Sequence, residues 1–63
     1  MTLEEAVTMV GGWPDNRNVP RLLRDAIEAA DGEHKENLGQ MVEILLASSL
    51  TKADTDLVSK FFG

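Results

Sequence analysis

The sequence predicts an all-α fold, a compact bundle of three to four short helices in a single domain that spans residues 1–63. Three observations predict this fold class. Apolar residues recur at helical spacing in four segments, and residues that typically begin or end helices stand between these segments. No segment alternates apolar and polar residues with the β-branched enrichment that is typical of a strand.

The first helix is expected between Thr2 and Gly11. The Thr2 hydroxyl can accept a hydrogen bond from the Glu5 amide while the Glu5 carboxylate accepts one from the Thr2 amide, which forms a capping box. We expect Gly11 and Gly12 to end the helix, because glycine readily adopts the left-handed conformation that closes helices. The apolar face consists of Leu3, Ala6, Val7 and Val10.

The second helix follows a connector of turn-favouring residues, 13–18. We expect Asn18 to cap this helix and Pro20 to lie in its first turn, where the missing amide proton costs little. Gly32 is expected to end it. Its apolar face is regular and consists of Val19, Leu22, Leu23, Ala26, Ile27 and Ala30.

The third helix begins either near Glu33 or at Leu38 with Asn37 as its cap, and we favour the earlier start. Gly39 indicates either a close contact with a neighbouring helix or a weak point, since glycine costs about 1 kcal/mol relative to alanine inside a helix. Apolar residues cover most of the surface of the second half, which is typical of a central helix. They are Leu38, Met41, Val42, Ile44, Leu45, Leu46, Ala47 and Leu50.

The fourth helix is expected to begin after Thr51, with Thr51 as cap and Asp54 at the third helical position. Its apolar face consists of Ala53, Leu57, Val58 and Phe61. Because Phe61 continues this face, we expect its side chain inside the bundle. Phe62 lies beside the face and is the better candidate for an interface with another chain.

No group of residues in the sequence forms a recognisable catalytic or metal-binding pattern. The only imidazole, His34, stands among polar residues, and Ser48 and Ser49 lack the turn that activates a serine nucleophile. Asp54 and Asp56 are two positions apart in a helix and point in different directions. Calcium-binding and phosphate-binding loops are also missing. We therefore predict no enzymatic activity, no cofactor and no metal ion.

The small size of the chain limits the core that it can bury. A 60-residue domain buries only about 60% of the surface of its unfolded chain, and such domains often add a disulfide, a metal or a second subunit. The sequence has no cysteine and one histidine, so tight helix packing or oligomerisation must compensate, and a homodimer is a reasonable structural hypothesis. The absence of cysteine also fits a reducing compartment, and we expect a cytoplasmic location.

The termini and the charge restrict the possible partners. The acidic N-terminus does not resemble an export signal, and no apolar stretch approaches the roughly 20 residues of a membrane span. The formal net charge of -5 opposes binding to nucleic acid or to an anionic membrane. A helix-turn-helix reading is less favoured, because the helix that would enter the DNA groove carries Asp54, Asp56 and only one late lysine, Lys60.

The candidate partner-binding residues are Trp13, Arg17, Arg21, Arg24 and Phe62. The three arginines follow one another at i, i+4 and i+7, so they share one side if the second helix extends slightly backward. Together with Trp13 they could bind an acidic protein surface or phosphates. The alternative is that Arg21 pairs with Asp25, Arg24 pairs with Glu28, and Trp13 covers the core.

These observations predict a small acidic, non-enzymatic protein-binding module that regulates or inhibits a larger protein partner. The short sequence from Met1 to Gly63 is typical of a stand-alone accessory factor, such as those that phages and mobile elements encode. The alternative is a self-assembling homodimeric structural or adaptor protein, in which a second copy covers the apolar excess of the third and fourth helices.

Overall fold

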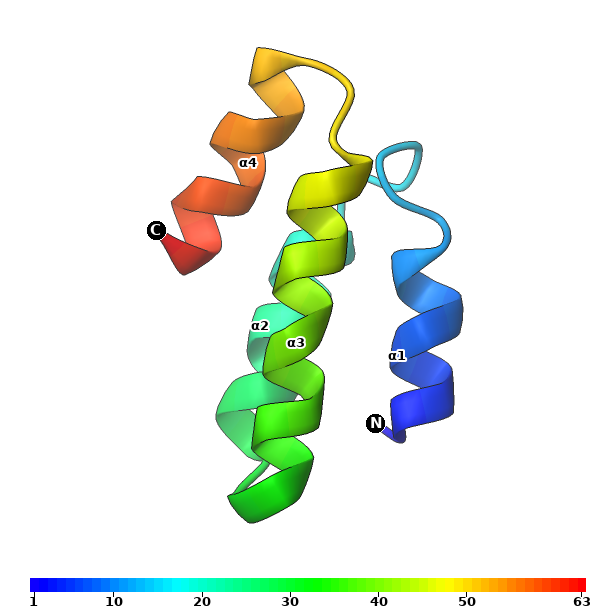
Figure 1. Cartoon of the computed structure of the whole chain (residues 1–63), viewed down its shortest axis with the longest axis vertical. Helices are drawn as coiled ribbons and strands as arrows, with labels where there is room; N and C mark the ends of the chain where they lie inside the picture. Colours follow the sequence, from blue (N-terminus) through cyan, green and yellow to red (C-terminus); the bar gives the residue numbers. More distant parts are fainter.

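The computed structural model describes all 63 residues and contains four α-helices. They are α1 (Leu3–Val10), α2 (Val19–Ala29), α3 (Gly32–Ser48) and α4 (Lys52–Phe62). Successive helices run in opposite directions along the bundle, so α1 is parallel to α3 (Figure 1). The all-α fold class that the sequence predicts is confirmed.

The predicted capping box at Thr2 forms, and the predicted cap at Thr51 forms a second capping box with Asp54. At the start of α1, the Glu5 amide donates to Thr2 Oγ1 at 3.1 Å and the Thr2 amide donates to Glu5 Oε1 at 2.9 Å. This bond from the Thr2 amide lowers the pKa of the Glu5 carboxyl below its ordinary value. At the start of α4, the Asp54 amide donates to Thr51 Oγ1, and the Thr51 amide donates back to the Asp54 carboxylate.

The cap of α2 differs from the prediction. Asn18 stands at the N-cap position, but its side chain makes no capping hydrogen bond. Its backbone is already in the right-handed helical region, whereas a capping side chain usually extends from a β-region backbone. Instead, the side chain of Asn16 accepts a hydrogen bond from the Asn18 amide at 3.0 Å.

Two glycines have roles other than those predicted. Gly11 ends α1 with a right-handed backbone (φ -61°), so the predicted left-handed closure is wrong there. The second helix ends at Ala29, and Gly32 begins α3 with a φ of +59°, the only positive φ in the chain. The left-handed residue of the turn between α2 and α3 is therefore Gly32, at the start of α3. The early start of the third helix is confirmed.

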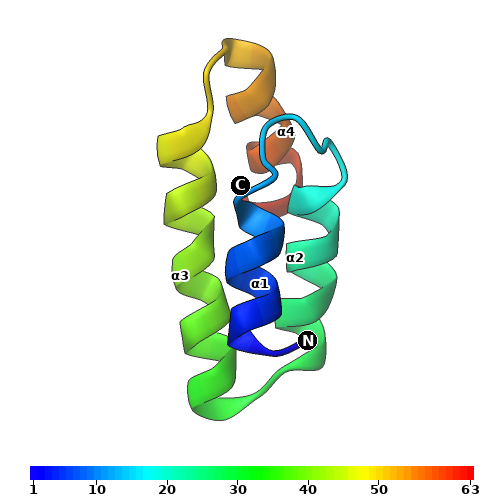
Figure 2. The same cartoon turned by 90° about the vertical axis from the view of Figure 1, so that its right-hand side faces the viewer.

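The core lies around α2 and α3, each of which packs against all three other helices. Figure 2 shows α1 beside α2 and α3, and α1 makes no packing contact with α4. Leu45 of α3 is fully buried and belongs to the core cluster. The prediction that the third helix is central is thus confirmed. The buried cluster consists of Val10, Trp13, Val19, Leu23, Leu45 and Val58.

None of the four helices combines the length and the apolar character that a membrane span requires.

Two glycine substitutions in α3 should change stability in opposite directions. A Cβ added at Gly39 meets no atom within 4 Å, so the close contact considered for this glycine is absent. Gly39→Ala should therefore raise the free energy of unfolding by up to about 1 kcal/mol through helix propensity. Gly32→Ala should lower it by about 1 kcal/mol, because alanine is strained at a positive φ. Urea denaturation measures both changes, and shifts of the same sign would contradict this account.

Candidate functional site

Trp13 is a buried residue that joins the connector to α3. Only 5% of its surface is exposed. The indole Nε1 donates to the Leu45 carbonyl at 3.1 Å and to Ser49 Oγ at 3.3 Å. Leu45 is among the last four residues of α3, whose carbonyls have no amide partner within the helix. Of the two interpretations of Trp13, the structure supports the one in which it covers the core.

Arg17 lies over Trp13 and pairs with a buried carboxylate. Its guanidinium carbon is 4.8 Å from the centroid of the Trp13 ring, which is a cation–π distance. The same guanidinium donates to the Pro14 carbonyl and forms a salt bridge with Asp54. Asp54 also accepts hydrogen bonds from the amides of Leu50 (2.9 Å) and Thr51 (3.2 Å). Asp54 therefore links the connector to the junction of α3 and α4.

The other two arginines pair with a different carboxylate from Arg17. Because α2 begins only at Val19, Arg17 belongs to the connector, and the backward extension of the helix that the shared side of three arginines requires is absent. Arg21 pairs with Asp25 at 4.0 Å, as the alternative interpretation predicts. Arg24 also pairs with Asp25, at 3.2 Å, and not with Glu28. Arg21 and Arg24 thus share one carboxylate on the outside of α2.

Both terminal phenylalanines are half-buried, and their packing differs from the prediction. Phe62, which we expected at an interface, packs against the core cluster. The Phe61 ring, which we expected inside, lies under the guanidinium of Arg24 at 4.8 Å and near the Lys60 ammonium at 5.8 Å. Neighbouring residues on a helix differ by 100° in direction, so the rotation of α4 about its own axis decides which ring faces the core.

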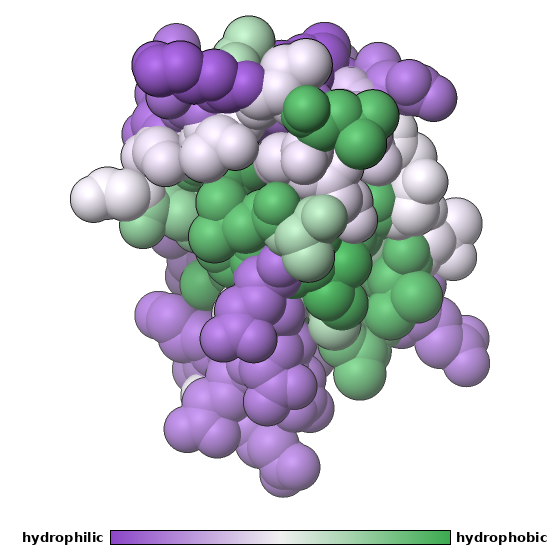
Figure 3. All heavy atoms as spheres, turned by 45° about the horizontal axis from the view of Figure 1, so that its top comes forward, coloured by the Kyte–Doolittle hydropathy of each residue, from purple (hydrophilic) through white to green (hydrophobic).

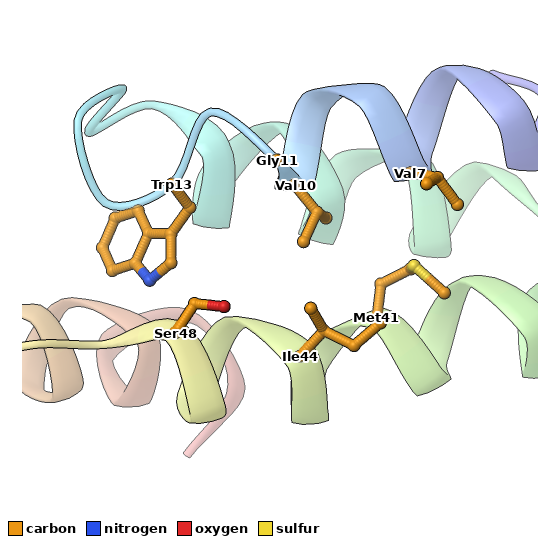
Figure 4. Close-up of a pocket in the computed structure, with 7 residues that line it drawn as sticks. All are labelled: Val7, Val10, Gly11, Trp13, Met41, Ile44 and Ser48. Atoms are coloured by element: carbon orange, nitrogen blue, oxygen red, sulfur yellow. The ribbon is translucent and has the colours of Figure 1, made fainter.

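An apolar groove lies between α1 and α3. We call it the α1/α3 groove; it is lined by Val7, Val10, Gly11, Trp13, Met41, Ile44 and Ser48. Figure 4 shows the side chains of Val7 and Val10 pointing from α1 toward α3, and those of Met41, Ile44 and Ser48 pointing from α3 toward α1. Its volume is about 170 Å³. A cavity of roughly 150 Å³ accepts a benzene molecule, so the groove has room for one large apolar side chain.

The mouth of this groove exposes large apolar side chains. Val7 is 53% exposed and Ile44 is 45% exposed, although each belongs to an apolar face predicted from the sequence. The apolar excess of the third helix in the sequence indicated that apolar surface would stay exposed, because α3 carries more apolar surface than its neighbours can cover. The position of the groove could not be predicted, since it depends on where α1 docks. Exposed hydrophobic residues also gather in the middle of the face that Figure 3 shows, with hydrophilic residues around them.

Charge is distributed unevenly among the helices. α1 contains two acids, Glu4 and Glu5, and no base, while α3 contains three glutamates and one lysine. α2 and α4 each contain as many bases as acids. All four salt bridges of the chain involve aspartates, so no glutamate is paired. The two helices that form the groove therefore carry most of the net negative charge.

No group of three or more acidic or histidine side chains is arranged to hold a metal ion. The one histidine, His34, has its Nε2 at 2.8 Å from the Met1 carbonyl oxygen, which ties the N-terminus to the start of α3. Comparisons with protein-family models, with curated proteins and with solved structures found no match for this chain.

The salt bridge of Asp54 should make stability depend on pH in the acid range. The Arg17 guanidinium, followed by the Leu50 amide, lowers the pKa of the Asp54 carboxyl in the folded protein. A carboxyl group whose pKa is lower in the folded than in the unfolded protein stabilises the fold at pH values above its ordinary pKa of about 4. This contribution to stability is lost as the pH falls below that value. Asp54→Asn should therefore be less stable at neutral pH and should lose less stability from pH 5 to pH 2.

Asp56→Asn is the matched control for this experiment. Asp56 lies on the same helix but is exposed and pairs only with Lys52. Urea denaturation between pH 2 and pH 7 measures both variants. The account is wrong if Asp54→Asn retains the acid sensitivity of the wild type.

Proposed function

We propose that this chain is a non-enzymatic protein-binding module that regulates or inhibits a larger protein by occupying part of its surface. The observation that carries the proposal is the α1/α3 groove, where Val7 and Ile44 stay half-exposed at the mouth of an apolar pocket. Exposed apolar side chains around a concave site are typical of protein interfaces. When a partner covers these apolar side chains, their removal from water contributes favourably to the free energy of binding.

The groove replaces the surface that the sequence suggested. Trp13 and Arg17 are engaged within the chain, and Phe62 packs on the core. Arg21 and Arg24 stay partly exposed on α2, but both pair with Asp25. A partner that bound there would compete with these pairs, whereas the aliphatic side chains of Val7 and Ile44 have no polar partner to lose. The proposal includes a cytoplasmic location, which the absence of cysteine supports.

The second candidate function is that of a self-assembling homodimer with a structural or adaptor role. Leu46 is 45% exposed and Leu50 is 80% exposed, and neither lines the α1/α3 groove. A second copy that covered these leucines would leave the groove open. Size-exclusion chromatography with light scattering gives the mass directly, and a dimer that Leu46→Gln and Leu50→Gln dissolve would favour this candidate.

Partner capture should depend on the groove. With the tagged chain as bait in lysate from its source, the double variant Val7→Gln and Ile44→Gln should recover its partner at least about tenfold less well than the wild type. The reason is that burial of one aliphatic side chain contributes about 1.5 to 3 kcal/mol, and 1.4 kcal/mol is tenfold in affinity. Quantitative mass spectrometry of the captured proteins measures the change.

Leu46→Gln is a matched control, because Leu46 has the same exposed fraction as Ile44 but lies outside the groove. It should capture the partner as well as the wild type does. A second control, Arg21→Ala with Arg24→Ala, tests the outer face of α2. Loss of the partner in this control but not in the groove variant would move the binding surface to α2 and refute the role of the groove.

A further inference from the structure

We propose that the α1/α3 groove receives a basic amphipathic helix of the protein partner. This inference rests on the protein-binding function proposed above and names the chemistry of the occupant. Three features of the groove support it: its shape, the apolar side chains at its mouth, and the charge of the two helices that form it.

The shape of the groove fits a helix. α1 and α3 run side by side in the same direction (Figures 1 and 2), and the groove follows α1 from Val7 to Gly11 and continues to Trp13. The stretch from Val7 to Gly11 has five residues, which corresponds to about 7.5 Å at 1.5 Å per residue. Between one and two turns of a partner helix cover this length, and a helix presents apolar residues to such a groove at i, i+3 and i+4. The chain has no strand whose edge could pair with an extended peptide.

The apolar floor can hold one anchor of the partner. Val10 is buried and Met41 is half-buried, whereas the more exposed Val7 and Ile44 come from the two opposite helices of the groove (Figure 4). The volume of about 170 Å³ suits one leucine, isoleucine, methionine or phenylalanine side chain. Residues of the partner one turn before and after this anchor would then contact Val7 and Ile44.

The charge around the groove favours a basic partner. Glu4 precedes Val7 by three positions on α1, so the two side chains are neighbours on the helix surface. Glu43 lies next to Ile44, and both line a shallow hollow that adjoins the groove. Neither glutamate forms a salt bridge within the chain. Lysine or arginine residues that flank the apolar stripe of a partner helix would pair with them.

The same charges argue against a second copy of this chain in the groove. A symmetric dimer brings the same surface of both subunits together, so the unpaired glutamates of α1 and α3 would face one another. Like charges at an interface oppose association. Anionic ligands such as nucleic acid or acidic lipid are disfavoured for the same reason.

The test uses defined peptides and the intrinsic fluorescence of the protein. Trp13 is the only tryptophan of the chain and lines the groove, so its emission reports occupancy. The probe is a synthetic 14-residue amphipathic peptide of leucine and lysine. The first control peptide has the same composition in an order that destroys the apolar stripe, and the second has glutamate in place of lysine. Peptide titrations at low and high salt measure the dissociation constants.

The leucine–lysine peptide should bind with one-to-one stoichiometry and at least about tenfold more tightly than either control peptide. Ile44→Gln should weaken its binding about tenfold, whereas Leu46→Gln should leave it unchanged. Glu43→Gln should weaken it by about two- to fivefold at low salt, an effect that should shrink in 0.5 M salt, while the matched variant Glu28→Gln on α2 should have no effect. Amide chemical shifts should change along α1 and α3.

Equal affinity for the lysine and glutamate peptides would overturn the inference, and so would equal effects of Ile44→Gln and Leu46→Gln. The comparison of peptides uses the wild-type protein, so it holds even if a variant fails to fold. A dimer that Ile44→Gln dissolves would assign the groove to a second copy and also overturn it. If capture of the natural partner depends on Val7 and Ile44 while the charge of the peptide has no effect, the protein-binding function stands and only the basic occupant is refuted.

Discussion

The burial of Trp13 is the interaction on which the arrangement of the bundle depends. The helices α2, α3 and α4 form a continuous up-and-down unit, but α1 reaches this unit only through the connector and its contacts with α2 and α3. The indole fills the core between the connector and α3, and its Nε1 satisfies a carbonyl at the end of α3. The position of Trp13 thereby determines where the preceding helix can lie.

The network around Trp13 also satisfies backbone groups that helix ends leave without partners. The Leu45 carbonyl at the end of α3 accepts from the indole, and the amides of Leu50 and Thr51 before α4 donate to Asp54. Arg17 neutralises this buried carboxylate from the connector and covers the outer face of the indole. One tryptophan, one arginine and one aspartate thus connect the connector to α3 and α4, and the chain has no disulfide to hold these junctions together.

Local features of the structure could be predicted from the sequence, whereas contacts between distant residues could not. The capping boxes at Thr2 and Thr51 depend on residues three positions apart, so their sequence pattern is sufficient. The salt bridge of Arg17 with Asp54 joins residues 37 positions apart, and only the packing of α4 brings them together. The packing of Phe62, and not Phe61, against the core cluster could not be predicted for a related reason, because it depends on the rotation of α4.

The exposure of apolar surface at the candidate site could be predicted from the sequence, but its position on the molecule could not. The width of the apolar stripe on the third helix indicated surface beyond the needs of a small core, and Ile44 belongs to that stripe. Which part of the stripe stays exposed depends on the docking of α1, to which Trp13 contributes. The tryptophan and the arginines drew attention as typical interface residues, yet in this chain the fold itself engages Trp13 and Arg17.

The concentration of negative charge on α1 and α3 has a consequence for how the molecule meets other molecules. Because α2 and α4 are balanced in charge, the chain is an electric dipole whose negative pole is the side that bears the groove. In the field of a cationic surface, such a dipole turns before contact, so collisions occur more often with the groove facing the surface than random tumbling would allow. The glutamates thus orient the encounter at distances where the apolar side chains exert no force.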